Sequence, residues 1–433
     1  MNNKTLGNIF KGDKVIWMIF FFLCMISIVE VYSASSSLSF KGGNYWSPII
    51  KHAGILGVGT FMMILVLNVK CKYFKLATPI LLALSFFTLL WVLFAGAKTN
   101  DANRWISFIG IQFQPSEIAK GTLILAVAQI LSAMQTPTGA DRKACGYILL
   151  ISTFIILPIA VENLSTAALL FGVVILMMFI GRVPLDQLGK LMGGLALAAV
   201  FVITMVMLIG KDRSKEELTT KEHLTEQVVT AEKEKAEEGF FDKVFHRADT
   251  WKARIDKFLS HEYVAPKDYD LDKDAQVAHA NIAIATSDIV GKGPGNSNER
   301  DFLSQAFSDF IYAIIIEEMG IEGAALVALL YIFLLFRTGR IAHRCENNFP
   351  AFLAMGIALL LVTQALFNML VAVGLAPVTG QPLPLVSKGG TSSIINCIYI
   401  GVILSISRSA KRKATDNDYD DEPATVQTAT VLA

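Results

Sequence analysis

The chain has 433 residues, of which 53% are hydrophobic and 17% charged, and its mean hydropathy is +0.52. These values exclude a disordered chain, a coiled coil and an ordinary water-soluble enzyme. The formal net charge is only +1, so the chain lacks the overall basic field that binds nucleic acid, and no nucleic-acid partner is expected.

Ten apolar stretches are long enough to cross a membrane, because a spanning helix needs roughly 20 mostly apolar residues. They lie near residues 15–34, 49–69, 76–96, 115–134, 146–162, 165–181, 189–210, 320–337, 351–374 and 391–408. The boundary between the fifth and sixth is the least marked, since only Glu162 and Asn163 interrupt a long apolar run. The sequence therefore predicts an all-α integral membrane protein of about ten transmembrane helices.

Basic residues follow every even-numbered stretch, which is the positive-inside pattern with both termini in the cytoplasm. On this topology residues 1–14 form a cytoplasmic N-terminus and residues 15–408 one polytopic membrane domain. Residues 211–308 form a single large exterior loop between the seventh and eighth spans, and residues 409–433 form a cytoplasmic tail that we expect to be disordered. The five cysteines show no CxxC pair, and the six histidines no HExxH pair, so no zinc site of common spacing is expected.

Two parts of the large loop differ in character. Residues 214–238 are densely charged and are typical of a solvated helix or a disordered insertion, with a partner-binding arm as the alternative. In residues 241–259, apolar side chains recur at helical spacing among basic ones. That pattern predicts an amphipathic basic helix, which either lies on an anionic membrane surface or packs on the protein itself.

Ionisable groups within apolar stretches are costly, so they are functional candidates. Glu117 and Lys120 lie three residues apart on one face of the fourth stretch, where they either form a structural ion pair or bind a ligand. Lys51 and His52 lie near the exterior start of the second stretch, where we expect them to reach the membrane interface. Glu30 lies close to the exterior end of the first stretch and is expected to contact water.

Four segments rich in proline, glycine and polar residues fall on the exterior side of the predicted topology. They are residues 103–117, 291–297, 308–320 and 377–390. The second resembles an anion-binding glycine loop but has neither the Walker nor the GxGxxG spacing. Irregular backbone at membrane depth is tolerated only where it lines a cavity or is buried in protein. We therefore expect the four segments to share an exterior-facing cavity with carboxylate, cation and amide groups.

Asp309 stands at the exterior start of an apolar run. A carboxylate in that position is partly desolvated, which raises its pKa and makes it a stronger base. The alternative is a helix N-cap, because Ser308 and Asp309 precede a predicted helical run. The residues alone leave both roles open.

The runs NRWISFIGIQFQPSEIAK, GKGPGNS, SDFIYAIIIEEMG and NMLVAVGLAPVTGQPLPLVSKGGTSSI resemble the SEDS family (shape, elongation, division and sporulation) over nearly the whole chain. The resemblance implies a peptidoglycan glycosyltransferase in the cytoplasmic membrane that polymerises lipid II and works with a class B penicillin-binding transpeptidase. It favours a division-type member, which implies other division proteins as partners and a location at the septum, over an elongation-type member.

Residue by residue, the family's essential loop aspartate falls on Asp309, which the resemblance makes the catalytic residue and a candidate metal ligand. The substrate-binding candidates are Arg104, Gln114, Ser116, Glu117, Lys120, Arg247, Arg254, Gln276, Lys292, Asn296, Ser297, Thr379, Ser387 and Lys388. This chain departs from the family pattern at 161–166, at 303–307 and at Lys388, where the family has tyrosine.

The chemistry implied is attack of a sugar hydroxyl on an anomeric carbon that carries a lipid pyrophosphate. The hydroxyl needs a base, the role expected of Asp309. The departing pyrophosphate needs cations, either basic side chains or a divalent metal such as Mg²⁺ or Mn²⁺, and no organic cofactor is expected. A lipid II flippase and a non-catalytic scaffold that recruits a transpeptidase are the alternative functions.

Overall fold

A computed structural model describes residues 10–35, 46–95, 97–99, 102–108, 111–209, 275–303 and 307–417. The charged stretch at 214–238, the predicted amphipathic helix at 241–259 and both extreme ends of the chain lie outside these residues. For the same reason the predicted roles of Arg247 and Arg254 stay predictions.

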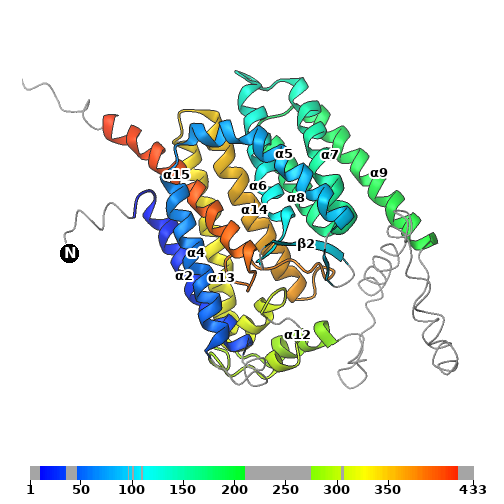
Figure 1. Ribbon diagram of the computed structural model, residues 1–433, viewed down its shortest axis with the longest axis vertical. Helices are drawn as coiled ribbons and strands as arrows, with labels where there is room; N and C mark the ends of the chain where they lie inside the picture. Colours follow the sequence, from blue (N-terminus) through cyan, green and yellow to red (C-terminus); the bar gives the residue numbers. More distant parts are fainter. Residues whose placement is uncertain are drawn as a thin grey trace, which may run out of the picture.

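Ten long helices form a bundle in the described part of the chain (Figure 1). They are α2 (Lys14–Ala34), α4 (Ser47–Leu67), α5 (Cys71–Ala95), α6 (Pro115–Ala133), α7 (Arg142–Glu162), α8 (Leu164–Ile180), α9 (Leu185–Ile209), α13 (Ile311–His343), α14 (Asn348–Ala372) and α15 (Thr391–Asn417). A shorter helix, α12 (Ala275–Ala285), and the 3-10 turn η2 (Glu299–Asp301) precede α13.

Each of the ten predicted stretches coincides with one of these long helices, and the predicted fold class is confirmed. Within the described residues, eight helices are long and apolar enough to cross a membrane, while α8 is apolar but only 17 residues long. The helix break between α7 and α8 falls at Asn163, whose side chain caps α8 by accepting a hydrogen bond from Thr166 N at 3.2 Å. The number of membrane crossings and their orientation stay predictions.

The eighth predicted stretch, near 320–337, is longer in the structure. Helix α13 already begins at Ile311 and is interrupted at Gly320, whose φ of 69° and ψ of −173° are not helical. A Cβ at Gly320 would lie 2.1 Å from Ile289 O, so only glycine fits where these two segments meet. The residues between Ile311 and this kink therefore form a separate helical piece ahead of the span.

Two small sheets add to the helices. Strands β1 (Ala97–Thr99), β2 (Ala102–Phe108) and β3 (Ile111–Phe113) form an antiparallel sheet in sequence order, with Ile106 opposite Phe113. Strands β4 (Gln135–Thr136) and β5 (Gly139–Ala140) form a hairpin. The segment 103–117, expected to be irregular, is thus largely extended up to the start of α6 (Figure 1).

Glycines let helices of the bundle approach closely. A Cβ at Gly59 of α4 would lie 2.7 Å from Cys397 Sγ, and a Cβ at Gly401 of α15 would lie 2.7 Å from Met63 O. Small residues at helix contacts are a common way to pack helices in lipid, where apolar burial between helices adds little. The pairing of α4 with α15 brings the start of α15 beside the predicted exterior end of α4.

The chain between α14 and α15, residues 373–390, has no helix or strand and is called the α14–α15 segment below. Leu383, Leu385 and Val386 are each at most 1% exposed, so irregular backbone is buried here, as the prolines and glycines predict. Leu385 has a φ of 65°, a left-handed conformation that is rare for a bulky side chain. The surrounding contacts must therefore hold this turn.

Candidate functional site

Helix α6 begins with a buried ion pair. Lys120 Nζ lies 2.8 Å from Glu117 Oε1 and 3.0 Å from Gln364 Oε1 of α14, and Lys120 is only 1% exposed. Tyr399 of α15 donates a hydrogen bond to the backbone carbonyl of Glu117, while Glu117 Oε2 has no hydrogen-bond partner among the described residues. Side chains from two other helices thus contact this turn of α6, and Glu117 Oε2 is placed to accept a hydrogen bond from a bound group.

Two amide side chains of α14 hold the α14–α15 segment. Gln364 Nε2 donates to Pro382 O at 3.0 Å, and Asn368 Nδ2 donates to Gln381 O at 2.8 Å. The Gln381 side chain in turn donates to Thr166 Oγ1 near the start of α8. Gln364 and Asn368 are four residues apart, so they lie about 5–6 Å from each other on one helix face.

Asp309 joins the same network through its backbone. Asn368 Nδ2 also donates to Asp309 O at 2.8 Å, and a Cβ at Gly380 would lie 3.9 Å from Asp309 Oδ2. The N-cap position of α13 is held by Phe310, which makes no side-chain capping bond. The N-cap position thus falls one residue after Asp309, and Asp309, which is half-buried, lies with its carboxyl against the α14–α15 segment.

The residues before Asp309 are held by the end of the α14–α15 segment. The hydroxyl of Ser387 donates to Ser308 O, and Lys388 N donates to Phe307 O at 2.9 Å. Lys388 Nζ lies 4.6 Å from the centre of the Phe307 ring. Burial, together with the nearby charge of Lys51, lowers the pKa of Lys388. Ser387 thus has a positional role, while Lys388 brings a cation to this side of Asp309.

Thr379 is the remaining predicted contact in the α14–α15 segment. Its Oγ1 is buried and has no hydrogen-bond partner among the described residues. It directly precedes Gly380, where an added Cβ would be in contact with the Asp309 carboxyl. A hydroxyl so placed can donate to, or accept from, a bound polar group.

The glycine loop at 291–297 is occupied by the protein's own carboxylates. Gly295 N donates to Glu318 Oε2 at 2.9 Å, and Ser297 N donates to Glu318 Oε1 at 3.3 Å. Asn298 N donates to Glu317 Oε1 at 3.0 Å. Both glutamates are fully buried. The resemblance to an anion-binding loop is therefore physically sound, but the anion is an acidic pair at the end of the first piece of α13.

Lys292, Asn296 and Ser297, predicted to contact substrate, take part in this internal arrangement. Lys292 Nζ lies 2.6 Å from Glu317 Oε1, and the hydroxyl of Ser297 donates to Glu317 Oε2. Asn296 Nδ2 donates to Lys292 O at 3.0 Å. Lys292 is thus paired with Glu317, just as Lys120 is paired with Glu117.

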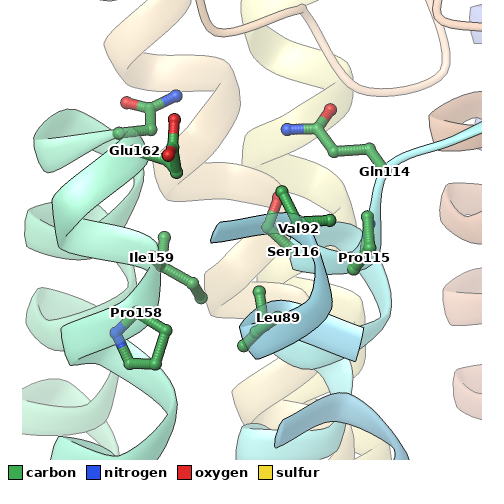
Figure 2. Close-up of a pocket in the computed structure, with 9 residues that line it drawn as sticks. Leu89, Val92, Gln114, Pro115, Ser116, Pro158, Ile159 and Glu162 are labelled. Carbon is green, nitrogen blue, oxygen red and sulfur yellow. The ribbon is translucent and has the colours of Figure 1, made fainter. Parts of the chain in front are cut away.

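A pocket of about 320 Å³, part of it open to the surroundings, lies where α5, α6 and α7 meet (Figure 2). Its lining is apolar from Leu89, Val92, Pro115, Pro158 and Ile159, and polar from Gln114, Ser116, Glu162 and Asn163. Figure 2 shows Gln114 and Glu162 on opposite sides of the pocket, with Ser116 between them. The Ser116 hydroxyl is buried without a hydrogen-bond partner among the described residues. Gln114 and Ser116, both predicted substrate contacts, therefore lie at one amphipathic pocket.

Two further predicted residues are placed only by their backbone or helix. Arg104 lies in β2, and its side chain is outside the described part of the structure. Gln276 is half-buried in α12, which lies with β2 toward the lower end of the bundle in Figure 1. Their predicted contacts with substrate stay predictions.

Among the described residues, a divalent cation near Asp309 would have only one carboxylate ligand from the protein. The described residues contain no group of three or more histidine, cysteine, aspartate or glutamate side chains that could hold a metal ion. Asp309 would then supply a single carboxylate, and the remaining ligands would be water and phosphate oxygens, a mode that Mg²⁺ commonly adopts. A cation would supply charge stabilisation for a departing phosphate group.

Gln364, Asn368, Gln381 and Thr166 are site residues that the sequence analysis did not select. The sequence could have indicated two of them, because Gln364 and Asn368 are polar residues four apart in a largely apolar stretch. The sequence could not have indicated the contact of Gln381 with Thr166, because the two residues are 215 positions apart.

The fold and the site define a helical membrane protein with a buried polar centre at one end of its bundle. The chain belongs to the FtsW/RodA/SpoVE family, whose model, described as "Cell cycle protein", matches residues 13–240 and 241–412. The SEDS resemblance found in the motifs is thereby confirmed.

Relatives are similar in sequence, and solved structures are similar in fold. The probable peptidoglycan glycosyltransferase FtsW of Geobacter metallireducens is 28% identical over 413 residues, covering 94% of this chain and 97% of the relative. The stage V sporulation protein E of Bacillus subtilis is 27% identical, covering 92% and 98%. The rod shape determining protein RodA of Thermus thermophilus shares the fold, with a TM-score of 0.61 and 20% identity over 93% of this chain and 98% of that one. A chain from the structure titled "Structural coordination of polymerization and crosslinking by a peptidoglycan synthase complex" gives a TM-score of 0.68 at 21% identity, over 92% and 98%.

Proposed function

We propose that this chain is a peptidoglycan glycosyltransferase that polymerises lipid II at the outer face of the cytoplasmic membrane. The observation that carries the proposal is the convergence of Asp309 and Lys120 on one face of α14. Asn368 holds the Asp309 segment, and Gln364, one turn away, contacts Lys120. A base and a cation held by adjacent positions of one helix suit a reaction with an anionic leaving group.

In this mechanism Asp309 accepts the proton of the attacking sugar hydroxyl. The hydroxyl oxygen bonds to the anomeric carbon with inversion, while the bond from that carbon to the lipid pyrophosphate breaks. Lys120 and Lys388 are the cations that offset the charge of the departing pyrophosphate. A divalent cation on Asp309 would supply further charge stabilisation there. The names of the relatives, glycosyltransferases of the FtsW type, support this reading.

The experiment is an assay of the purified full chain with a class B transpeptidase partner and fluorescent lipid II. Glycan chains resolved on a gel are the expected product. Lipid that moves between the leaflets of a vesicle without glycan formation would identify a flippase instead. If neither occurs while the chain still binds the transpeptidase, it is a scaffold.

We further propose a role in septal wall synthesis with other division proteins. A fluorescent fusion that concentrates at the division site supports this role, and an even distribution along the side wall contradicts it.

A further inference from the structure

A buried hydrogen bond between Ser27 and His52 joins α2 to α4 next to the α14–α15 segment. Ser27 Oγ of α2 lies 2.7 Å from His52 Nε2 of α4, and Ser27 also donates to Val386 O at 2.7 Å. Ser27 and Val386 are fully buried, and His52 is 1% exposed. The mechanism proposed above uses neither side chain.

The geometry fixes which ring nitrogen of His52 carries a proton. A backbone carbonyl only accepts hydrogen bonds, so the single hydroxyl proton of Ser27 is directed at Val386 O. The serine oxygen can then only accept from the imidazole, and His52 Nε2 must carry hydrogen. His52 Nδ1 has no hydrogen-bond partner among the described residues, so the Nε2–H bond to Ser27 is the polar contact that the ring makes there.

The anchored carbonyl belongs to the strained turn. Val386 follows Leu385, whose φ of 65° is unfavourable for its side chain, and precedes Ser387. Within the turn, Leu383 N donates to Ser387 Oγ at 2.7 Å, and the Ser387 hydroxyl donates to Ser308 O. A displacement of Val386 is therefore passed directly to the residue that precedes Asp309.

We propose that Ser27 and His52 are positioning residues for the glycosyl transfer. The His52 Nε2–H orients the Ser27 hydroxyl, Ser27 holds Val386 O, and the turn holds the backbone that carries Asp309. The expected effect on the rate of glycosyl transfer rests on the proposed function. The anchoring of the turn by Ser27 and His52 does not depend on that function. Neither side chain touches the substrate in this scheme.

Substitutions of equal length separate hydrogen bonding from packing. In His52→Gln the amide nitrogen is as many bonds from Cα as Nε2 of histidine, so it can donate to Ser27. In His52→Met a methyl group takes that place and cannot donate. Ser27→Ala removes the hydroxyl itself. The matched control is Ser405→Ala, which removes another hydrogen bond from a buried serine to a backbone carbonyl, that of Val69 at 2.6 Å, in α15 rather than at this turn.

The first measurement is polymerisation of lipid II by each folded variant with its transpeptidase. A displacement near 1 Å can reduce a rate by about 100-fold, so we expect His52→Met and Ser27→Ala to lose about 10–100-fold in kcat with little change in KM. His52→Gln should retain most activity, as should Ser405→Ala. Equal activity of the Gln and Met variants would overturn the proposal.

The second measurement is hydrogen–deuterium exchange of peptides covering residues 381–390. Exchange should rise in His52→Met and Ser27→Ala but not in His52→Gln or Ser405→Ala. Asp309→Asn, which removes the proposed base but leaves the anchor, should show wild-type exchange. Unchanged exchange in His52→Met would refute the anchor even if the chain proves inactive as a polymerase, so the two proposals fail separately.

Discussion

At the scale of single residues, hydrogen bonds from two other parts of the chain fix the backbone around Asp309. Its carbonyl accepts a hydrogen bond from Asn368, its neighbour Ser308 accepts one from Ser387, and Phe310 occupies the N-cap position. A carboxylate whose backbone is held on both sides has little freedom to move, which is what a general base requires.

We expect Asp309→Asn to insert and fold normally, because Phe310 holds the N-cap position of α13 and asparagine caps a helix about as well as aspartate. Asparagine cannot accept a proton at neutral pH, so polymerisation should fall by at least about 100-fold. Asp309→Glu should recover little, since one added methylene moves the carboxylate by roughly 1 Å. The control is Asp301→Asn, whose side chain is 49% exposed beside Arg300. Polymerisation by Asp309→Asn near the wild-type rate would contradict the assignment.

The Glu117–Lys120 ion pair can be tested by comparing the loss of one partner with the replacement of both. Lys120→Ala strands a buried Glu117 carboxylate and removes the donor to Gln364, so it should destabilise the protein by about 3–5 kcal/mol. The double change Glu117→Gln with Lys120→Met leaves no buried charge and should be more stable than the single variant. If the double variant is stable but inactive, Lys120 also contributes to the reaction. Thermal unfolding and polymerisation of both variants would measure this, and a fully stable, active Lys120→Ala would exclude both roles.

At the scale of elements, the glycine loop and the first piece of α13 form one unit. The two buried carboxylates accept from the backbone amides of Gly295, Ser297, Asn298 and Glu299. Lys292 pairs with Glu317, and Arg300 donates to Gly295 O at 2.6 Å. The unit fixes where the first piece of α13 ends, and Asp309 lies at the opposite end of that piece.

Two glycines of this loop give a matched test. Gly291 has a φ of 79°, and a Cβ there would lie 2.3 Å from Gly320 N, whereas Gly295 has a φ of 84° and open space around it. Gly295→Ala should therefore cost only the left-handed strain, about 1–2 kcal/mol. Gly291→Ala meets rigid backbone as well and should cost clearly more. Thermal unfolding in detergent compares them, and equal losses would show that the close approach of 291 to 320 is not as described.

At the scale of the whole molecule, a further ion pair connects the start of α2 to the C-terminal part of α13. Asp13 caps α2 by accepting from Val15 N at 2.9 Å, and Arg337 Nη2 lies 2.7 Å from Asp13 Oδ2. Burial raises the pKa of Asp13, but the hydrogen bond and charge of Arg337, with the backbone donors of Ile16 and Val15, outweigh burial and lower it overall.

A folded-state pKa below the unfolded one stabilises the protein above the unfolded value, and this contribution is lost as the pH falls below about 4. Asp13→Asn keeps the cap but loses the charged partner of Arg337, so we expect a loss of about 1–3 kcal/mol at pH 7. The difference between wild type and variant should shrink as the pH falls from 5 to about 3. A difference in unfolding temperature that does not change with pH would contradict this account.

The orientation of the molecule is tested by a reporter fused near Thr230. The positive-inside pattern places this part of the chain outside and both termini in the cytoplasm. A reporter that is active only outside the cytoplasm should therefore be active there. Activity of a cytoplasm-only reporter at that position would reverse the topology.

The sequence by itself determined the ten helices, because a length of about 20 apolar residues is a local property that lipid selects directly. It also located the break at Glu162 and Asn163 and the irregular α14–α15 segment, and it gave the pairing of Glu117 with Lys120 as one of two alternatives. Each of these features depends on residues close together in the chain. The SEDS motifs supplied the family. These features need no knowledge of which helices pack together.

Only the tertiary structure decided which polar groups meet. Sequence spacing could not show that the anion of the glycine loop is Glu317 with Glu318, nor that Gln381 reaches Thr166, because side-chain hydrogen bonds join residues distant in sequence once helices have packed. It could not show that Phe310 rather than Asp309 occupies the N-cap position of α13, nor that Asn368 of another helix donates to the Asp309 carbonyl. In a membrane, apolar stretches specify that helices form, whereas close packing and buried hydrogen bonds specify how they assemble.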